Sequence, residues 1–134
     1  MKVSFDFDST LDRPDVRRFA KELVSEGVEV WIVTSRRSNE DAALVDPWVK
    51  DRIYKSNKKL FRVADNVGIK REHIIFTNFV DKIESIKDNG FIFHLDDDVD
   101  ELMLIRNSDD TCIPINVNHF EWELDCKEAL RSDI

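Results

Sequence analysis

The sequence predicts an α/β protein in which a five-stranded parallel sheet lies between two layers of helices. Three observations favour this class. Short apolar, β-branched segments alternate with segments of helical periodicity along most of the chain. The 134 residues, 42% of them hydrophobic, suffice for one core but not for two. Only three glycines and three prolines occur, so no flexible linker is expected, and we predict a single domain over residues 1–134.

The expected elements follow one another in strand–helix order. The five strands are predicted at residues 2–7, 28–33, 73–76, 91–95 and 113–117. The first helices are predicted from Pro14 to Gly27 and over residues 38–45, the second with Ser38 as its cap. Because Pro47 interrupts that second helix, the next is predicted from about Ser56 to Gly68. The last three are predicted after Asp81 as cap, over residues 99–106 with Asp98 as cap, and from Phe120 onward. This alternation predicts a three-layer, Rossmann-like arrangement, in which ligands bind beyond the carboxyl ends of the strands.

Charge and cysteine content narrow the class of protein. The net charge of −8 disfavours general nucleic-acid binding, but residues 36–71 hold ten basic residues against five acidic ones, a local net charge of +5. No apolar run is long enough to span a membrane, and the N-terminus has no signal-peptide pattern. Cys112 and Cys126 fit neither a disulfide framework nor a zinc pattern. We therefore expect a cytoplasmic protein with no membrane partner.

The first expected strand ends in two carboxylates. Asp6 and Asp8 are two positions apart, and on a strand such residues point to the same side. Two close carboxylates repel each other, and a divalent cation relieves that repulsion. One acid can then act as a nucleophile and the other as a proton donor. A solvent-exposed turn rich in Asp and Ser explains the same residues, so this segment alone does not decide between the two interpretations.

Three further strand ends carry groups suited to phosphate and metal chemistry. The second ends in Thr34-Ser35-Arg36, whose hydroxyls and backbone N–H groups suit a phosphate but also an ordinary helix cap. Lys82 follows the third strand and is either a charge for phosphate oxygens or a surface lysine. The fourth runs into three consecutive acids, residues 96–98, whose oxygens suit Mg²⁺. The order of these groups over four successive strand ends is more specific than any one of them.

This order resembles that of the haloacid dehalogenase (HAD) superfamily of hydrolases, and the resemblance spans residues 3 to about 117. Its most specific part is the hydrophobic strand followed by DxDxT, and the variant here, DFDST, is similar to that of phosphoserine phosphatases. The resemblance implies a Mg²⁺-dependent phosphatase that works through an aspartyl-phosphate intermediate. Asp6 would be the nucleophile, and Asp8 would protonate the leaving group and then activate water.

The remaining roles also come from the resemblance. The catalytic set it implies is Asp6, Asp8, Thr34 and Lys82. The implied metal ligands are Asp6, Asp8 through its backbone carbonyl, Asp96 and Asp97, and which of the last two touches the metal directly stays open. The groups expected to contact the substrate or its phosphate are Ser9, Thr10, Thr34, Ser35, Arg36 and Lys82.

The sequence departs from many members of this superfamily because a helix begins at Pro14, almost directly after the first motif. The insertion point for a cap domain is nearly empty, so we expect a minimal cap or none. By resemblance, uncapped members often act on large substrates or cover the site by self-association, and homo-oligomerisation stays open. The basic segment 36–71 fits a phosphorylated substrate such as a nucleotide or a nucleic-acid end, but an ordinary solvated helix face explains it too.

Two other functions compete with a phosphatase. The first is a binding or regulatory module that keeps the HAD-like fold but is catalytically silent. The second is a receiver domain, in which the phosphoacceptor is an Asp after the third strand. Here that strand ends in Thr77-Asn78, which disfavours the receiver interpretation.

Overall fold

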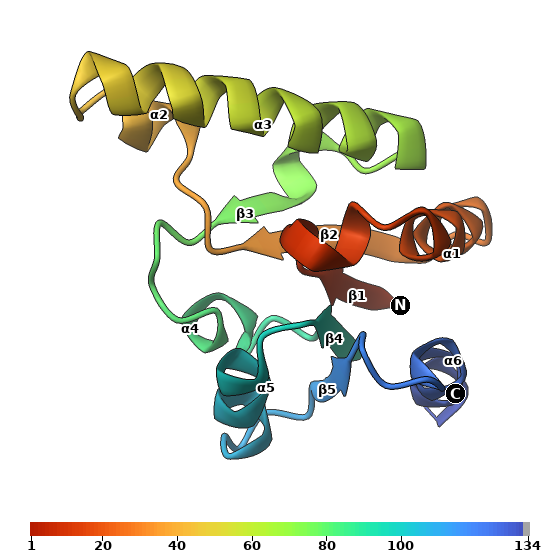
Figure 1. Cartoon of the computed structure of the whole chain (residues 1–134). Helices are drawn as coiled ribbons and strands as arrows, with labels where there is room; N and C mark the ends of the chain where they lie inside the picture. The colour runs from red at the N-terminus through yellow and green to blue at the C-terminus, as the bar shows by residue number, and fades with distance from the viewer. Residues whose placement is uncertain (133–134) are drawn as a thin grey trace.

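The predicted parallel sheet is confirmed. The structure, a computed structural model that describes residues 1–132, contains five parallel strands in the spatial order β3-β2-β1-β4-β5 (Figure 1). The strands are β1 (Lys2–Phe5), β2 (Glu29–Thr34), β3 (Ile74–Phe76), β4 (Phe93–Asp96) and β5 (Ile113–Asn116). The strand order reverses direction between β1 and β4, which pair with Phe5 opposite Leu95. Such a switch point is where open α/β sheets leave a crevice for ligands.

Helices cover both faces of the sheet, as predicted. One face carries α1 (Pro14–Ser25), α3 (Pro47–Val67) and α6 (Trp122–Ser132), and the other carries α4 (Ile83–Ile86) and α5 (Val99–Arg106) (Figure 1). The strand residues alternate between two apolar clusters: Phe5, Ile32 and Leu95 belong to the larger cluster under α1, α3 and α6. Val33 belongs to the smaller one under α4 and α5. This alternation follows from the two-residue period of a strand.

The helix α3 begins nine residues earlier than the predicted start near Ser56. We expected Pro47 to interrupt a helix, but it occupies the first turn of α3, where its missing N–H costs nothing. The side chain of Asp46 caps this turn by accepting a hydrogen bond from the backbone N–H of Trp48 at 2.9 Å. The short helix α2 (Asn39–Ala42) is capped by Ser38, as predicted. As a result, the N-terminal half of α3 extends past the carboxyl ends of β2 and β3 (Figure 1).

Two smaller expectations near the strand ends have different outcomes. Asp98 caps α5 by accepting hydrogen bonds from the N–H groups of Asp100 and Glu101, as predicted. The predicted cap Asp81 is wrong, because Lys82 directly precedes α4 and no side chain caps that helix. A 3₁₀ turn, η2 (Arg71–His73), leads into β3.

The connection from β1 to α1 is short. It consists of one irregular helical turn, η1 (Phe7–Leu11), in which Ser9 has a left-handed backbone (φ 59°). No inserted domain separates the first strand from the first helix, as the sequence predicted. Among residues 1–132, none of the helices combines the length and the apolar character that crossing a membrane would require.

Candidate active site

Three groups from distant parts of the chain meet at the carboxyl ends of β1 and β4. The ammonium of Lys82 lies 2.8 Å from Asp6 Oδ1 and 2.6 Å from Asp96 Oδ2. All three side chains are buried, with Lys82 only 2% exposed and Asp6 4%. The backbone N–H of Asp6 donates to the carbonyl of Leu95 at 2.8 Å, which extends the β1–β4 pairing and holds the two acids side by side. The sequence-based expectation that these residues converge is therefore fulfilled for Asp6, Lys82 and Asp96.

A buried histidine fixes the orientation of Asp96. His94 lies on the same side of β4 as Asp96, and its Nε2 is 2.7 Å from Asp96 Oδ2. Its Nδ1 is 2.8 Å from the hydroxyl of Ser4 on β1. A neutral ring with the proton on Nε2 satisfies both contacts, donating to Asp96 and accepting from Ser4. Burial favours this neutral form, since it lowers the pKa of His94 despite the neighbouring Asp96.

The two buried acids differ in their tendency to ionise. Burial and the negative charge of Asp96 raise the pKa of Asp6 to about 9, although Lys82 opposes the shift. Burial acts in the same sense on Asp96, but His94 and Lys82 outweigh it and hold the pKa of Asp96 below its usual range. Burial would lower the pKa of Lys82, yet the two carboxylates raise it, so the ammonium stays charged. Full ionisation of Asp6 therefore requires additional positive charge.

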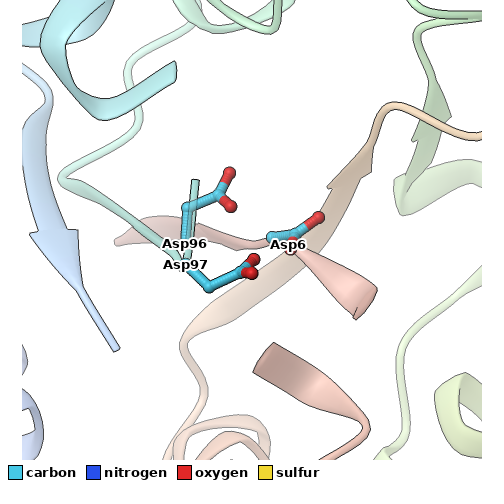
Figure 2. Close-up of side chains that lie close together, drawn as sticks. All are labelled: Asp6, Asp96 and Asp97. Atoms are coloured by element: carbon cyan, nitrogen blue, oxygen red, sulfur yellow. The ribbon is translucent and has the colours of Figure 1, made fainter. Parts of the chain in front are cut away.

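The arrangement of carboxylates suits a divalent cation. Oxygen atoms of Asp6, Asp96 and Asp97 all lie within 4.8 Å of one another, and Figure 2 shows the Asp97 carboxylate reaching toward that of Asp6. Asp96 accepts hydrogen bonds from Lys82, His94 and the N–H of Asp98, so its oxygens are occupied. The carboxylate of Asp97 is not held by Lys82 or His94, and its contact with Asp6 helps to raise the pKa of Asp6. Asp97 is therefore better placed than Asp96 to join Asp6 in holding an oxygen-seeking cation such as Mg²⁺.

The side chain of Asp8 lies outside this cluster. Its two oxygens face the guanidinium of Arg36 at 2.6 and 2.8 Å, and its carboxylate is 53% exposed. The chain leaves the extended conformation after Asp6, so the strand rule that placed both carboxylates on one side does not apply beyond β1. The guanidinium of Arg36 also packs over the ring of Phe7, with 4.9 Å between the guanidinium carbon and the ring centroid. The two bonds from Arg36 hold the Asp8 side chain at the rim of the site. The expected metal contact through the backbone carbonyl of Asp8 stays a prediction.

The hydroxyl groups expected near phosphate occupy different positions. Thr10 is fully buried and its hydroxyl is 3.4 Å from Asp6 Oδ2, so it lies beneath the acid. Ser9 is exposed in the turn. Thr34 is buried at the end of β2, where its hydroxyl accepts a hydrogen bond from the N–H of Arg36 at 3.3 Å. Ser35 is half-buried beside it.

The ends of β2 and β3 are joined by hydrogen bonds. The N–H groups of Thr77, Asn78 and Phe79 donate to the carbonyls of Thr34, Arg36 and Ser35 at 2.8, 3.2 and 2.9 Å. Asn78 and Phe79 both have left-handed backbones (φ 54° and 68°). Such conformations are costly for residues other than glycine and persist where surrounding contacts enforce them. In this loop the hydroxyl of Thr77 is buried without a partner among residues 1–132.

Two residues that organise this region, Glu101 and Asn57, were not predicted from the sequence. Glu101 on α5 accepts a hydrogen bond from the N–H of Lys82 at 2.9 Å and so fixes the start of α4. Asn57 on α3 donates to the Arg37 carbonyl and to Asn39 Oδ1, both at 3.0 Å. His94, by contrast, stands out in the sequence as a polar residue inside an apolar strand, which indicates a hydrogen-bonded core histidine or a group that supports the acids.

Comparison with known proteins adds no relative. No protein-family model matches the chain, and neither the curated proteins nor the solved structures gave a match.

Proposed function

We propose that this protein is a Mg²⁺-dependent phosphomonoester hydrolase with Asp6 as its nucleophile. The observation that carries the proposal is the convergence of Asp6, Lys82, Asp96 and Asp97 from three chain segments at the switch point of the sheet. An enzyme catalyses phosphoryl transfer mainly by positioning the nucleophile and by neutralising the charge of the phosphate. A buried lysine between two acids, next to a carboxylate pair that suits a cation, provides both.

In the proposed reaction, an oxygen of Asp6 attacks phosphorus and the bond to the ester oxygen breaks. Asp8 gives its proton to that leaving oxygen, after substrate has drawn Arg36 from it. Water then attacks the aspartyl-phosphate while Asp8 takes the water proton, which releases inorganic phosphate and regenerates Asp6. Mg²⁺, held by Asp6 and Asp97, would supply charge neutralisation for the phosphoryl oxygens. Lys82 would contribute a second positive charge and, together with that cation, favour the ionised form of Asp6.

The test measures hydrolysis of p-nitrophenyl phosphate with Mg²⁺ and with EDTA. We expect Mg²⁺-dependent turnover by the natural chain and none by Asp6→Asn, which conserves the shape of the side chain. The matched control Asp109→Asn changes an exposed aspartate away from the site and should retain full activity. Undiminished turnover by a pure Asp6→Asn preparation would exclude Asp6 as the nucleophile.

A catalytically silent binding module is the second candidate, and the placement of Asp8 favours it. A proton donor that stays paired with Arg36 could not serve the leaving group. This candidate predicts that Mg²⁺ raises the unfolding temperature of the natural chain although no ester is hydrolysed. Turnover of any ester that is lost in Asp6→Asn would exclude it.

A further inference from the structure

A cleft beside the acid cluster is the feature that the reaction scheme does not use. It has a volume of about 730 Å³, a size typical of small-molecule sites, and lies between α3 and the loops that follow β2 and β3. The lining includes Asp8, two residues after Asp6, and Ser35, which follows Thr34 at the end of β2. A phosphoester whose phosphorus faces Asp6 would therefore extend its leaving group into the cleft. Another hollow, of about 680 Å³ between β5 and α6, is lined by none of the site residues.

One wall of the cleft is apolar. Val45, Val49 and Ile53 line it from the loop before α3 and from the first turns of α3. Phe79 lines it from the loop after β3, with its ring 69% exposed on a left-handed backbone held by the bond to Ser35. The left-handed backbone of Phe79 holds its ring in solvent, where the ring adds nothing to the packing of the core. It does suit a flat, apolar part of a ligand, which a simple sugar phosphate lacks.

The remaining lining is polar, with three arginines beside the acidic Asp46 and the neutral Ser56 and Asn57. Arg36, Arg37 and Arg52 all border the cleft. Arg36 is engaged by Asp8, and Arg37 lies 3.6 Å from Asp41 while its guanidinium carbon is 5.5 Å from the centroid of the Phe79 ring. Arg52 has no carboxylate within ion-pair distance among residues 1–132. Among the basic residues of segment 36–71, these three arginines line the cleft. Other basic residues of α3 are exposed outside it: Lys55, Lys58, Lys59 and Arg62.

We propose that the leaving group of the substrate is a nucleoside that bears a further phosphate, with its base against the apolar wall and that phosphate at Arg52. This proposal rests on the proposed function for the reacting phosphate, but the cleft can be tested without turnover. A nucleoside bisphosphate and the phosphorylated end of a nucleic-acid strand share this chemistry. A phosphotyrosine peptide, which offers a ring but no such second phosphate, is the competing substrate.

The activity test compares kcat/KM for adenosine 3′,5′-bisphosphate, a 5′-phosphorylated oligonucleotide, a phosphotyrosine peptide and ribose 5-phosphate. We expect the two nucleotide substrates to exceed ribose 5-phosphate by tenfold or more, and the better of the two identifies the source. In Arg52→Gln the ratio of nucleotide to ribose 5-phosphate should fall about tenfold, the effect of losing one charge-assisted hydrogen bond. Arg62→Gln, the same change on the same helix but outside the cleft, should leave the ratio unchanged. Equal kcat/KM for nucleotide and ribose 5-phosphate, or a preference for the peptide, would overturn the proposal.

The binding test separates this proposal from the phosphatase. Calorimetric titration of adenosine 3′,5′-bisphosphate into Asp6→Asn, with Mg²⁺ present, should give binding that Arg52→Gln or Phe79→Ala weakens severalfold in the same background. Because the Phe79 side chain is mostly exposed, its removal should not impair folding. Binding of this kind without turnover of any ester would support the cleft and reject the phosphatase. Absence of binding, or binding insensitive to both substitutions, would reject the cleft.

Discussion

Replacement of Lys82 by methionine, which keeps the length and removes the charge, should destabilise the protein severely. The ammonium lies 2.8 Å from Asp6 and 2.6 Å from Asp96, and it is the counter-charge for the buried Asp96 carboxylate, whose pKa is held low. Removing one partner of a buried ion pair leaves uncompensated charge and costs about 3–5 kcal/mol. Domains of this size have total stabilities of about 5–15 kcal/mol, so this is a large fraction of the free energy of unfolding.

The assay is urea unfolding followed by circular dichroism at pH 7.5 in EDTA. We expect the unfolding midpoint to fall in Lys82→Met, and the melting temperature to fall by roughly 10 °C or more. The double variant Asp96→Asn/Lys82→Met should recover part of the loss, because it removes the carboxylate that stays ionised when the ammonium is lost. Lys87→Met changes an exposed lysine near the same helix and should leave the midpoint unchanged. A loss below about 1 kcal/mol in Lys82→Met, within the range of exposed ion pairs, would refute the view that Lys82 neutralises a buried charge cluster.

Three further predictions follow from the site. In EDTA, the free energy of unfolding should fall as the pH rises from about 4 to about 9. The reason is that the folded protein keeps a proton on Asp6, which the unfolded chain releases near its ordinary pKa of 3.8. Urea midpoints at pH 6 and pH 8.5 test this, and a higher midpoint at pH 8.5 would contradict it. Asp97→Asn should weaken Mg²⁺ binding about tenfold or more, whereas an unchanged Mg²⁺ dependence of turnover or melting temperature would remove Asp97 from the metal ligands. Asn57→Ala should cost about 1–3 kcal/mol in thermal or urea unfolding, since it deprives a buried hydrogen-bonded junction of its central side chain; a cost near zero would mean that water replaces it.

The layout of the sheet was predictable because strong local signals agreed with one another. Apolar β-branched runs marked all five strands to within a few residues, and the cap at Ser38 and the one at Asp98 marked two helices. The start of α3 was not predictable with the same rule, because a proline ends one helix or begins another depending on the residue before it. Here a helix begins at Pro47, because the Asp46 side chain caps its first turn by accepting a hydrogen bond from the N–H of Trp48.

The candidate site was predictable as far as strand ends determine position. Asp6, Lys82 and Asp96 meet because parallel strands bring their carboxyl ends to one edge. The side-chain direction of Asp8 depends on dihedral angles in η1 and on a partner 28 positions away, Arg36, neither of which a local pattern specifies. The proposed preference for Asp97 over Asp96 as a cation ligand could not be predicted either, because it depends on the hydrogen bonds that Asp96 accepts from Lys82 and His94.

The backbone hydrogen bonds between the loops after β2 and β3 bear on how the substrate preference of this fold could change through substitutions. They join the backbone of Thr34, Ser35 and Arg36 directly to the segment that leads into Lys82, with no residue of α2 or α3 mediating these bonds. Val45, Val49, Ile53 and Arg52 belong to the stretch between those loops, whereas the proposed bond cleavage would depend on residues outside it. Substitutions from Val45 to Ile53 would thus alter which ester is accepted without displacing the atoms that attack phosphorus. A small scaffold built in this way can acquire new substrates by surface changes in one helical connection.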